Sequence, residues 1–193
     1  MKLLVITGPQ GSGNHLFAKI FSRHPVVKGW VMNDYWEGHH MEPFSKYWHN
    51  PELLKDYKWE HDYYVTSISC PYYRDKQPHT PKYKEFLDAV PIEKEIVIIG
   101  RDPTILHHQQ VRVRGEDTLD LETLKSLSNP HFISTELLFL YRQEYVNYLS
   151  RLLDFPISNN IEDLINNTNK KYISAVGEQE LDHIIKRVSL IES

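Results

Sequence analysis

The chain has 193 residues, of which 40% are hydrophobic and 25% are charged, as in an ordinary soluble globular protein with a sizeable core. A net charge of −4 argues against general binding to nucleic acid or to an anionic membrane. Cys70 is the only cysteine, which excludes an intrachain disulfide, and the longest N-terminal apolar run, "LLVI", is too short for a signal peptide or a membrane span. We therefore expect a cytoplasmic protein.

The first elements follow one another without a gap. The four consecutive aliphatic residues of "KLLVITG" (2–8) predict a buried strand, and a glycine-rich break follows. From Asn14 the apolar residues recur at helical spacing until His24-Pro25, where proline ends the predicted helix. "PELLKDYKW" (51–59) predicts a short helix with Pro51 in its first turn.

The middle of the chain alternates strands and helices. Residues 61–70 predict a second strand, and residues 95–100, "EIVIIG", predict a third that is continuous enough to be central. Between them, "TPKYKEFLDAV" predicts a helix with Thr80 as its N-cap and Pro81 at its first position. A further helix is expected to start near Pro103.

The last part of the chain is predicted to be mostly helical. Residues 134–153 predict the strongest helix, with one apolar stripe made of Leu137, Leu138, Tyr141, Tyr145, Leu149 and Leu152. "FPIS" (155–158) is expected as a short strand, and helices are expected at 160–167 and 178–191. Glu162 and Asp163 are expected to cap the first of these two helices.

This alternation predicts an α/β fold. Hydrophobic strands separated by helices favour a mostly parallel central sheet flanked by helices on both faces. No repeat, low-complexity tract or linker interrupts the sequence. We therefore expect a single three-layer domain over residues 1–193.

The glycine-rich break has the outline of a phosphate-binding loop. Gly8, Gly11 and Gly13 let the backbone turn so that its amides can surround an anion, and the following helix adds its positive end. Ser12 and Asn14 can donate further hydrogen bonds. A glycine-rich turn that binds no ligand is the alternative interpretation.

The loop lacks the groups of an ATP-binding loop. In the pattern G-x-x-x-x-G-K-[ST], the lysine and hydroxyl positions are held here by Asn14 and His15. Imidazole is a poor ligand for Mg²⁺, and the strand at 95–100 does not end in a carboxylate. We therefore expect phosphate binding without a metal. A zinc site in the His-rich stretch after residue 38 is a weaker possibility, because its histidines lack a standard ligand spacing.

Arg101 leaves the predicted third strand at its carboxyl end, the side on which α/β folds bind ligands. A guanidinium there can pair with a phosphate through two hydrogen bonds. A salt bridge within the chain, for example to Asp102, is the alternative. Arg112 and Arg114, about three turns on in the next predicted helix, are expected on the solvated surface, and a position folded back over the ligand is the alternative.

Three stretches together resemble the sulfotransferase superfamily. Ser12-Gly13 matches the centre of its first loop, and Arg101-Asp102-Pro103 matches its second motif, a strand that ends in R-[DN]-P. The segment 137–164 resembles its third feature, a long helix followed by Y-E-D-L, with Ile161 in place of the tyrosine. The resemblance implies a P-loop-containing nucleoside triphosphate hydrolase-like fold and sulfuryl transfer from 3′-phosphoadenosine 5′-phosphosulfate, without a metal, to a small-molecule or saccharide acceptor.

The resemblance also implies roles for particular residues. The 5′-phosphosulfate of the donor would lie on the amides of Gly11, Ser12, Gly13, Asn14 and His15. Its 3′-phosphate would contact Arg101, with Gln109 in the position of a serine of the family. Donor binding would thus join the glycine loop to the end of the third strand.

This chain departs from the family at its catalytic positions. Gly11 stands where the loop carries a lysine or arginine, and Ser69 stands where soluble members carry a catalytic histidine. Serine without a partner base is a poor proton acceptor. Glu37, His39 and His40 are the other candidates for a base, because some members draw a carboxylate from that region.

Two alternatives remain open. One is a P-loop kinase of nucleotides or small molecules, whose openings "TGPQGSG" resembles. The other is a nucleotide-binding protein of the same fold that has lost catalysis, as the residues at positions 11 and 69 suggest.

Overall fold

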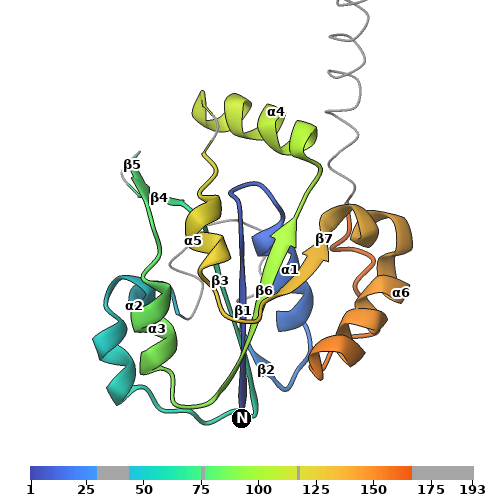
Figure 1. Cartoon of the computed structure of the whole chain (residues 1–193). Helices are drawn as coiled ribbons and strands as arrows, with labels where there is room; N and C mark the ends of the chain where they lie inside the picture. The colour runs from blue at the N-terminus through green and yellow to red at the C-terminus, as the bar shows by residue number, and fades with distance from the viewer. Residues whose placement is uncertain (30–43, 75–76, 117, 167–193) are drawn as a thin grey trace, which may run out of the picture.

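The computed structural model describes residues 1–29, 44–74, 77–116 and 118–166, and a five-stranded parallel sheet lies at their centre (Figure 1). All four strand pairings in this sheet are parallel. Across the sheet the strands are β2 (Val27–Lys28), β3 (Tyr63–Ser69), β1 (Lys2–Gly8), β6 (Glu93–Gly100) and β7 (His131–Ser134). The predicted α/β class with a mostly parallel sheet flanked by helices is confirmed.

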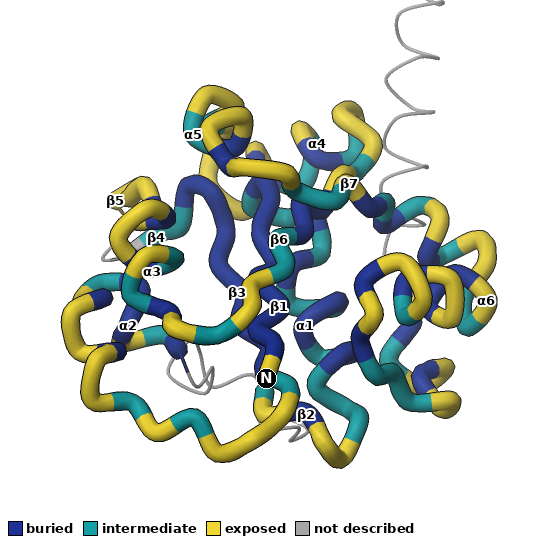
Figure 2. The backbone as a smooth tube through the Cα atoms, turned by 60° about the horizontal axis from the view of Figure 1, so that its bottom comes forward, coloured by how far each residue is buried: buried dark blue, intermediate teal, exposed yellow. Residues whose placement is uncertain are grey.

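The first strand is the middle of the sheet, which explains its unbroken aliphatic sequence. All seven residues of β1 are buried, and Figure 2 shows this strand dark along its length. Parallel strands covered on both faces read as continuous hydrophobic runs, because neither side of the strand meets water. Leu4 and Ile6 point to one face and Leu3 and Val5 to the other.

One face of the sheet is covered by α1 (Asn14–Ser22) and α6 (Thr135–Leu153). Phe17, Ala18, Ile20 and Phe21 of α1 are completely buried against the sheet. They recur at helical spacing in the sequence, and burying that apolar stripe is what stabilises α1 in this place.

The opposite face is covered by α2, η2, α3 and α5, a set of short helices. Their bounds are Ser45–His49, Pro51–Asp56, Tyr83–Ala89 and Leu121–Lys125. Trp48 of α2 stacks on Phe86 of α3 at a centroid distance of 3.7 Å, and its Nε1 donates to Thr66 Oγ1 of β3 at 3.0 Å. This indole fixes two helices to the sheet and satisfies its own buried donor.

The carboxyl ends of the strands are where the remaining elements lie. Helix α4 (Pro103–Arg114) crosses beyond the ends of β1 and β6 (Figure 1). A separate antiparallel hairpin of β4 (Tyr72–Arg74) and β5 (Gln77–His79) follows β3. Both elements therefore border the same end of the sheet as the glycine loop.

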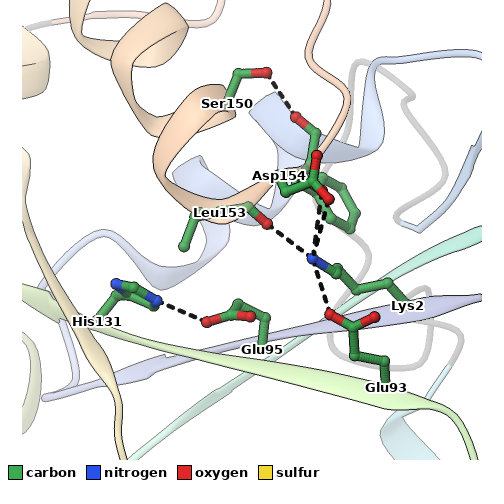
Figure 3. Close-up of polar contacts among 8 residues, drawn as sticks. Lys2, Glu93, Glu95, His131, Ser150, Leu153 and Asp154 are labelled. Carbon is green, nitrogen blue, oxygen red and sulfur yellow. Dashed lines mark hydrogen bonds and ion pairs between the residues drawn. The ribbon is translucent and has the colours of Figure 1, made fainter.

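At the amino end of the sheet, Lys2 joins the first strand to the end of α6 (Figure 3). Its Nζ donates to the Leu153 carbonyl at 3.1 Å and pairs with Glu93 Oε1 at 3.0 Å. Beside it, His131 Nε2 lies 2.7 Å from Glu95 Oε1. These contacts lie at the opposite end of the sheet from the glycine loop.

Most predicted elements are confirmed, with three errors after residue 79. Residues 155–158 form no strand, and residues 160–166 make only a turn in place of the predicted helix. Helix α3 begins at Tyr83, so Thr80 is not its N-cap; Thr80 Oγ1 instead donates to Asp120 Oδ2 at 3.2 Å. The helix predicted at 178–191 lies outside the described residues. No helix within the described ranges is long and apolar enough to cross a membrane.

The apolar stripe predicted for α6 is only partly buried. Leu138, Tyr145 and Leu149 are buried, but Tyr141 is 55% exposed and Leu137 is 40% exposed. The helix is interrupted at Arg142, whose backbone is not helical (φ 45°, ψ −119°). The positions that are buried, Thr135, Leu138, Tyr145, Val146, Leu149 and Leu153, still follow helical spacing, but their face is rotated from the predicted one and leaves Leu137, Tyr141 and Leu152 at its edge.

Candidate functional site

The glycine loop joins β1 to α1 in a tight turn. Gly8, Gly11 and Gly13 adopt positive φ values of 148°, 89° and 112°, and Ser12 N donates back to Pro9 O at 3.1 Å. Gly13 is the N-cap of α1, and no side chain caps this helix end. The first amides of an α-helix have no partner within the helix, so this end of α1 is suited to an anion.

Asn14 holds the loop together from inside. Its Nδ2 donates to Gly8 O at 3.1 Å and to Ser69 Oγ at 3.1 Å, and its Oδ1 accepts from Ser12 Oγ at 3.0 Å. Both loop side chains are buried, Asn14 at 4% exposed and Ser12 at 0%. At the position of the lysine in ATP-binding loops, this chain therefore places an amide that shapes the loop. The side chains of Ser12 and Asn14 are thus engaged within the protein, and they shape the loop rather than face a ligand.

Arg101 and the glycine loop converge. Arg101 follows β6, and its Nη1 donates to the carbonyl of Gly11 at 2.5 Å. The same nitrogen donates to Gln109 Oε1, which α4 brings back two turns into that helix. Asp102, the alternative partner of Arg101, instead caps α4 by accepting from Thr104 N at 2.9 Å and Ile105 N at 3.0 Å.

Helix α4 adds a second arginine. Arg114 is exposed, as expected for a surface residue, yet its Nε donates to Gln10 Oε1 at 3.0 Å and its guanidinium lies 4.8 Å from the ring centroid of Tyr73. One helical turn earlier, Gln110 Nε2 donates to Gln10 O at 2.8 Å. Positions 110 and 114 are four residues apart and so lie on the same face of α4, which turns both side chains toward Gln10 of the loop. This spacing is the signal in the sequence that pairs Arg114 with Gln110.

These elements enclose a cavity of about 430 Å³. Its walls come from the glycine loop, the end of β3, α4, the start of α6 and the segment after α6. The lining residues are Gln10, Gly11, Gly13, Asn14, His15, Leu16, Ser69, Tyr72, Arg101, Gln109, Gln110, Val113, Arg114, Thr135, Phe139, Leu164 and Asn166.

The charge of this lining favours an anion. Among the described residues it contains two arginines and a histidine, and no aspartate or glutamate. Guanidinium groups beside a helix N-terminus attract phosphate or sulfate and repel a divalent cation. In the described part of the chain, no group of three His, Cys, Asp or Glu side chains is arranged to hold a metal ion.

The candidate residues are distributed as follows. Of those expected to bind the donor, all but the buried Ser12 line the cavity. Ser69, a candidate for the catalytic position, also lines it and is 6% exposed. Glu37, His39 and His40 lie outside the described residues. Arg114, expected mainly on the surface, also lines the cavity, and Gln110 and Tyr72 were not among the candidates from the sequence.

Glu162 and Asp163 do not cap a helix, because no helix forms there. Glu162 pairs with Arg142, and Asp163 Oδ2 lies 2.6 Å from Arg23 Nη1. The hydrogen bond from Arg23 holds the pKa of Asp163 below its ordinary value of 3.8. These pairs fasten the segment after α6 to α1 and α6, and this segment supplies Leu164 and Asn166 to the cavity.

No family model matches this chain, and no curated protein matches it either. What the cavity binds is therefore inferred from its own residues.

Proposed function

We propose that the cavity binds 3′-phosphoadenosine 5′-phosphosulfate and that the protein is a sulfotransferase-like enzyme on a P-loop type of fold. The observation that carries the proposal is the approach of Arg101 to the glycine loop, with Nη1 at 2.5 Å from Gly11 O. A strand-loop-helix phosphate site and a strand-end arginine are the two features expected for the two phosphate-bearing ends of this donor. The acceptor is a small molecule or a saccharide.

The roles divide between backbone and side chain. The 5′-phosphosulfate lies at the amides of residues 11–15, at the positive end of the α1 dipole. The 3′-phosphate takes Arg101 as a partner, in exchange for the Gly11 carbonyl and Gln109, which hold the guanidinium in this structure. Gln109 then turns its amide nitrogen toward the same phosphate.

The transfer step itself asks little covalent work of the protein. An acceptor oxygen or nitrogen attacks sulfur, the bond from sulfur to the 5′-phosphate oxygen breaks, and that oxygen keeps the electron pair. Catalysis then rests on aligning the two molecules and on stabilising the leaving phosphate. Gly11 offers no cation for this, whereas Arg114 lines the cavity and can supply positive charge.

The binding step is tested with the desulfated product. We expect adenosine 3′,5′-bisphosphate to bind saturably in calorimetric titration, and Arg101→Met to weaken it roughly 30- to 100-fold, because a charge-assisted pair is worth about 2–3 kcal/mol. Arg112→Met is the control: Arg112 is an exposed arginine of α4 outside the cavity lining, and its loss should leave affinity unchanged. Absence of saturable binding up to millimolar concentration would refute the proposal.

The same titrations test the two alternatives. Binding of magnesium-ATP in preference to the bisphosphate would favour a kinase, against the missing loop lysine and the lining without carboxylates. Bisphosphate binding with no transfer of labelled sulfate from the donor would instead identify a binding protein that has lost catalysis.

A further inference from the structure

A phenol and an imidazole meet at the wall of the cavity. Tyr72, the first residue of β4, lines the cavity, and its hydroxyl lies 3.0 Å from Nδ1 of His49, the last residue of α2. The two rings meet edge to face with centroids 5.2 Å apart. These residues are separated by 23 positions in the sequence, so only the fold brings them together.

Ser69, three residues before Tyr72, also lines the cavity, and its Oγ accepts from Asn14 Nδ2 of the glycine loop at 3.1 Å. Tyr72 thus follows closely in the chain on a residue that contacts the loop proposed to hold the phosphosulfate. The ring of Tyr72 is held from its other neighbour, His79 of β5, by stacking at 5.5 Å. The hydroxyl is thus held by His49 and the ring by His79.

His15 is the histidine within the described lining of the cavity, so it is the other candidate for a base. It lies in the first turn of α1, where the positive end of the helix disfavours a further positive charge. His49 ends α2 and is joined to the phenol of Tyr72 at 3.0 Å. His15 belongs to the loop assigned to the donor phosphosulfate, so we take His49 as the proton acceptor on the side of the acceptor.

We propose that Tyr72 and His49 form the proton-accepting pair for the acceptor, an inference that rests on the proposed function. Tyr72 contacts the acceptor hydroxyl and takes its proton as sulfur is attacked, while the phenol passes its own proton to Nδ1 of His49. The bond from sulfur to the 5′-phosphate oxygen breaks, and the electron pair leaves with the bisphosphate. The pair supplies the base that Ser69 cannot supply at its position.

The pair predicts how the transfer rate depends on pH. His49 accepts a proton only while its imidazole is neutral. The transfer rate therefore rises with pH as this imidazole loses its proton. His79, which stacks on Tyr72, is a further titratable group beside the pair, so its contribution is separated by a control variant.

The experiment compares Tyr72→Phe and His49→Gln with His79→Gln, the matched control, which removes an imidazole that stacks on Tyr72 but leaves the hydroxyl contact in place. Bisphosphate affinity is measured by calorimetry, and transfer of labelled sulfate from the donor is measured with 2-naphthol, glucosamine and N-acetylglucosamine as acceptors from pH 5.5 to 8.5. We expect both test variants to lose roughly 100-fold or more in transfer rate with unchanged bisphosphate affinity. In His49→Gln the residual rate should also lose its rise with pH.

The outcomes separate the two proposals. A protein that binds no bisphosphate refutes the sulfotransferase proposal itself. If the bisphosphate binds, full transfer activity in Tyr72→Phe overturns only the proton-accepting pair, and so does an unchanged pH profile in His49→Gln. Bisphosphate binding without transfer to any of the three acceptors by the unmodified protein also overturns the pair. A matching loss in His79→Gln would assign the effect to packing of the hairpin and would overturn it as well.

Discussion

Gly8 lies so close to the backbone of a neighbouring strand that no side chain fits there. Its φ is +148°, and a Cβ built there would lie 2.6 Å from the carbonyl oxygen of Ile99 in β6. Gly115, at the end of α4, also has a positive φ, +85°, but nothing lies within 4 Å of a Cβ there. An alanine at position 115 would meet only backbone strain, whereas an alanine at position 8 would also clash with the sheet.

We expect Gly8→Ala to destabilise the protein clearly more than Gly115→Ala. The strained backbone costs about 1–2 kcal/mol for alanine at a left-handed position such as Gly115. At position 8 the contact with β6 adds roughly 1–3 kcal/mol, because a backbone carbonyl of a central strand cannot move aside. Urea unfolding of both variants measures the difference, and equal losses would contradict the packing of the loop against β6.

At the scale of elements, α4 is the helix that carries the site. It begins at Pro103 and is capped by Asp102. Its residues Gln109, Gln110 and Arg114 line the cavity. Its own packing is slight, with Leu106 and Gln110 as its buried residues. Its start is therefore expected to depend strongly on the cap.

Asp102→Ala should destabilise the protein by about 1 kcal/mol and also weaken bisphosphate binding, because it frees the amides of Thr104 and Ile105 at the start of α4. Asp102→Asn keeps a capping oxygen and should restore both properties in large part. Chemical unfolding and calorimetric titration of the two variants provide the measurements. Equal binding in all three proteins would show that the capping of α4 is not coupled to the site.

At the scale of the whole molecule, the side chain of Lys2 connects the start of the sheet to the last described helix. Lys2 is 8% exposed, and it joins the first strand of the sheet to the end of α6, 151 residues away, through the Leu153 carbonyl. Burial alone would lower the pKa of Lys2. The hydrogen bond and charge of Glu93, with the charges of Asp154 and Glu95, outweigh burial and raise that pKa above its ordinary value of 10.5.

Lys2→Met should cost about 2 kcal/mol of stability at pH 7, since it removes a charged donor from a buried carbonyl. Because the folded pKa is raised, the contribution of Lys2 is complete below pH 10.5 and is lost as pH rises through the folded pKa. The stability difference between the two proteins in urea should therefore shrink at the alkaline end. Lys84→Met, which breaks the exposed pair with Asp88, should leave stability at pH 7 unchanged. A difference that stays constant above pH 10.5 would contradict this account.

The sequence by itself determined the elements whose signal is local. The aliphatic run of β1, the three glycines and the proline-headed α4 depend on neighbouring residues, so they were predicted from the sequence. The same is true of the first candidates for the anion site, because a strand-loop-helix turn and a strand-end arginine can be recognised without the fold. The strand predicted at 155–158 was wrong, since a loop can bury its largest apolar side chain, Phe155 at 2% exposed, without pairing to a sheet.

Only the tertiary structure decided which residues from distant parts of the sequence contact one another. It brought Nη1 of Arg101 within 2.5 Å of Gly11, turned Arg114 back to Gln10, and placed His49 against Tyr72. The residues in each pair lie 90, 104 and 23 positions apart, and sequence periodicity carries no information at such separations. Contacts of this kind form because parallel strands deliver their carboxyl ends to one edge of a sheet, where chain segments from distant parts of the sequence must pack together.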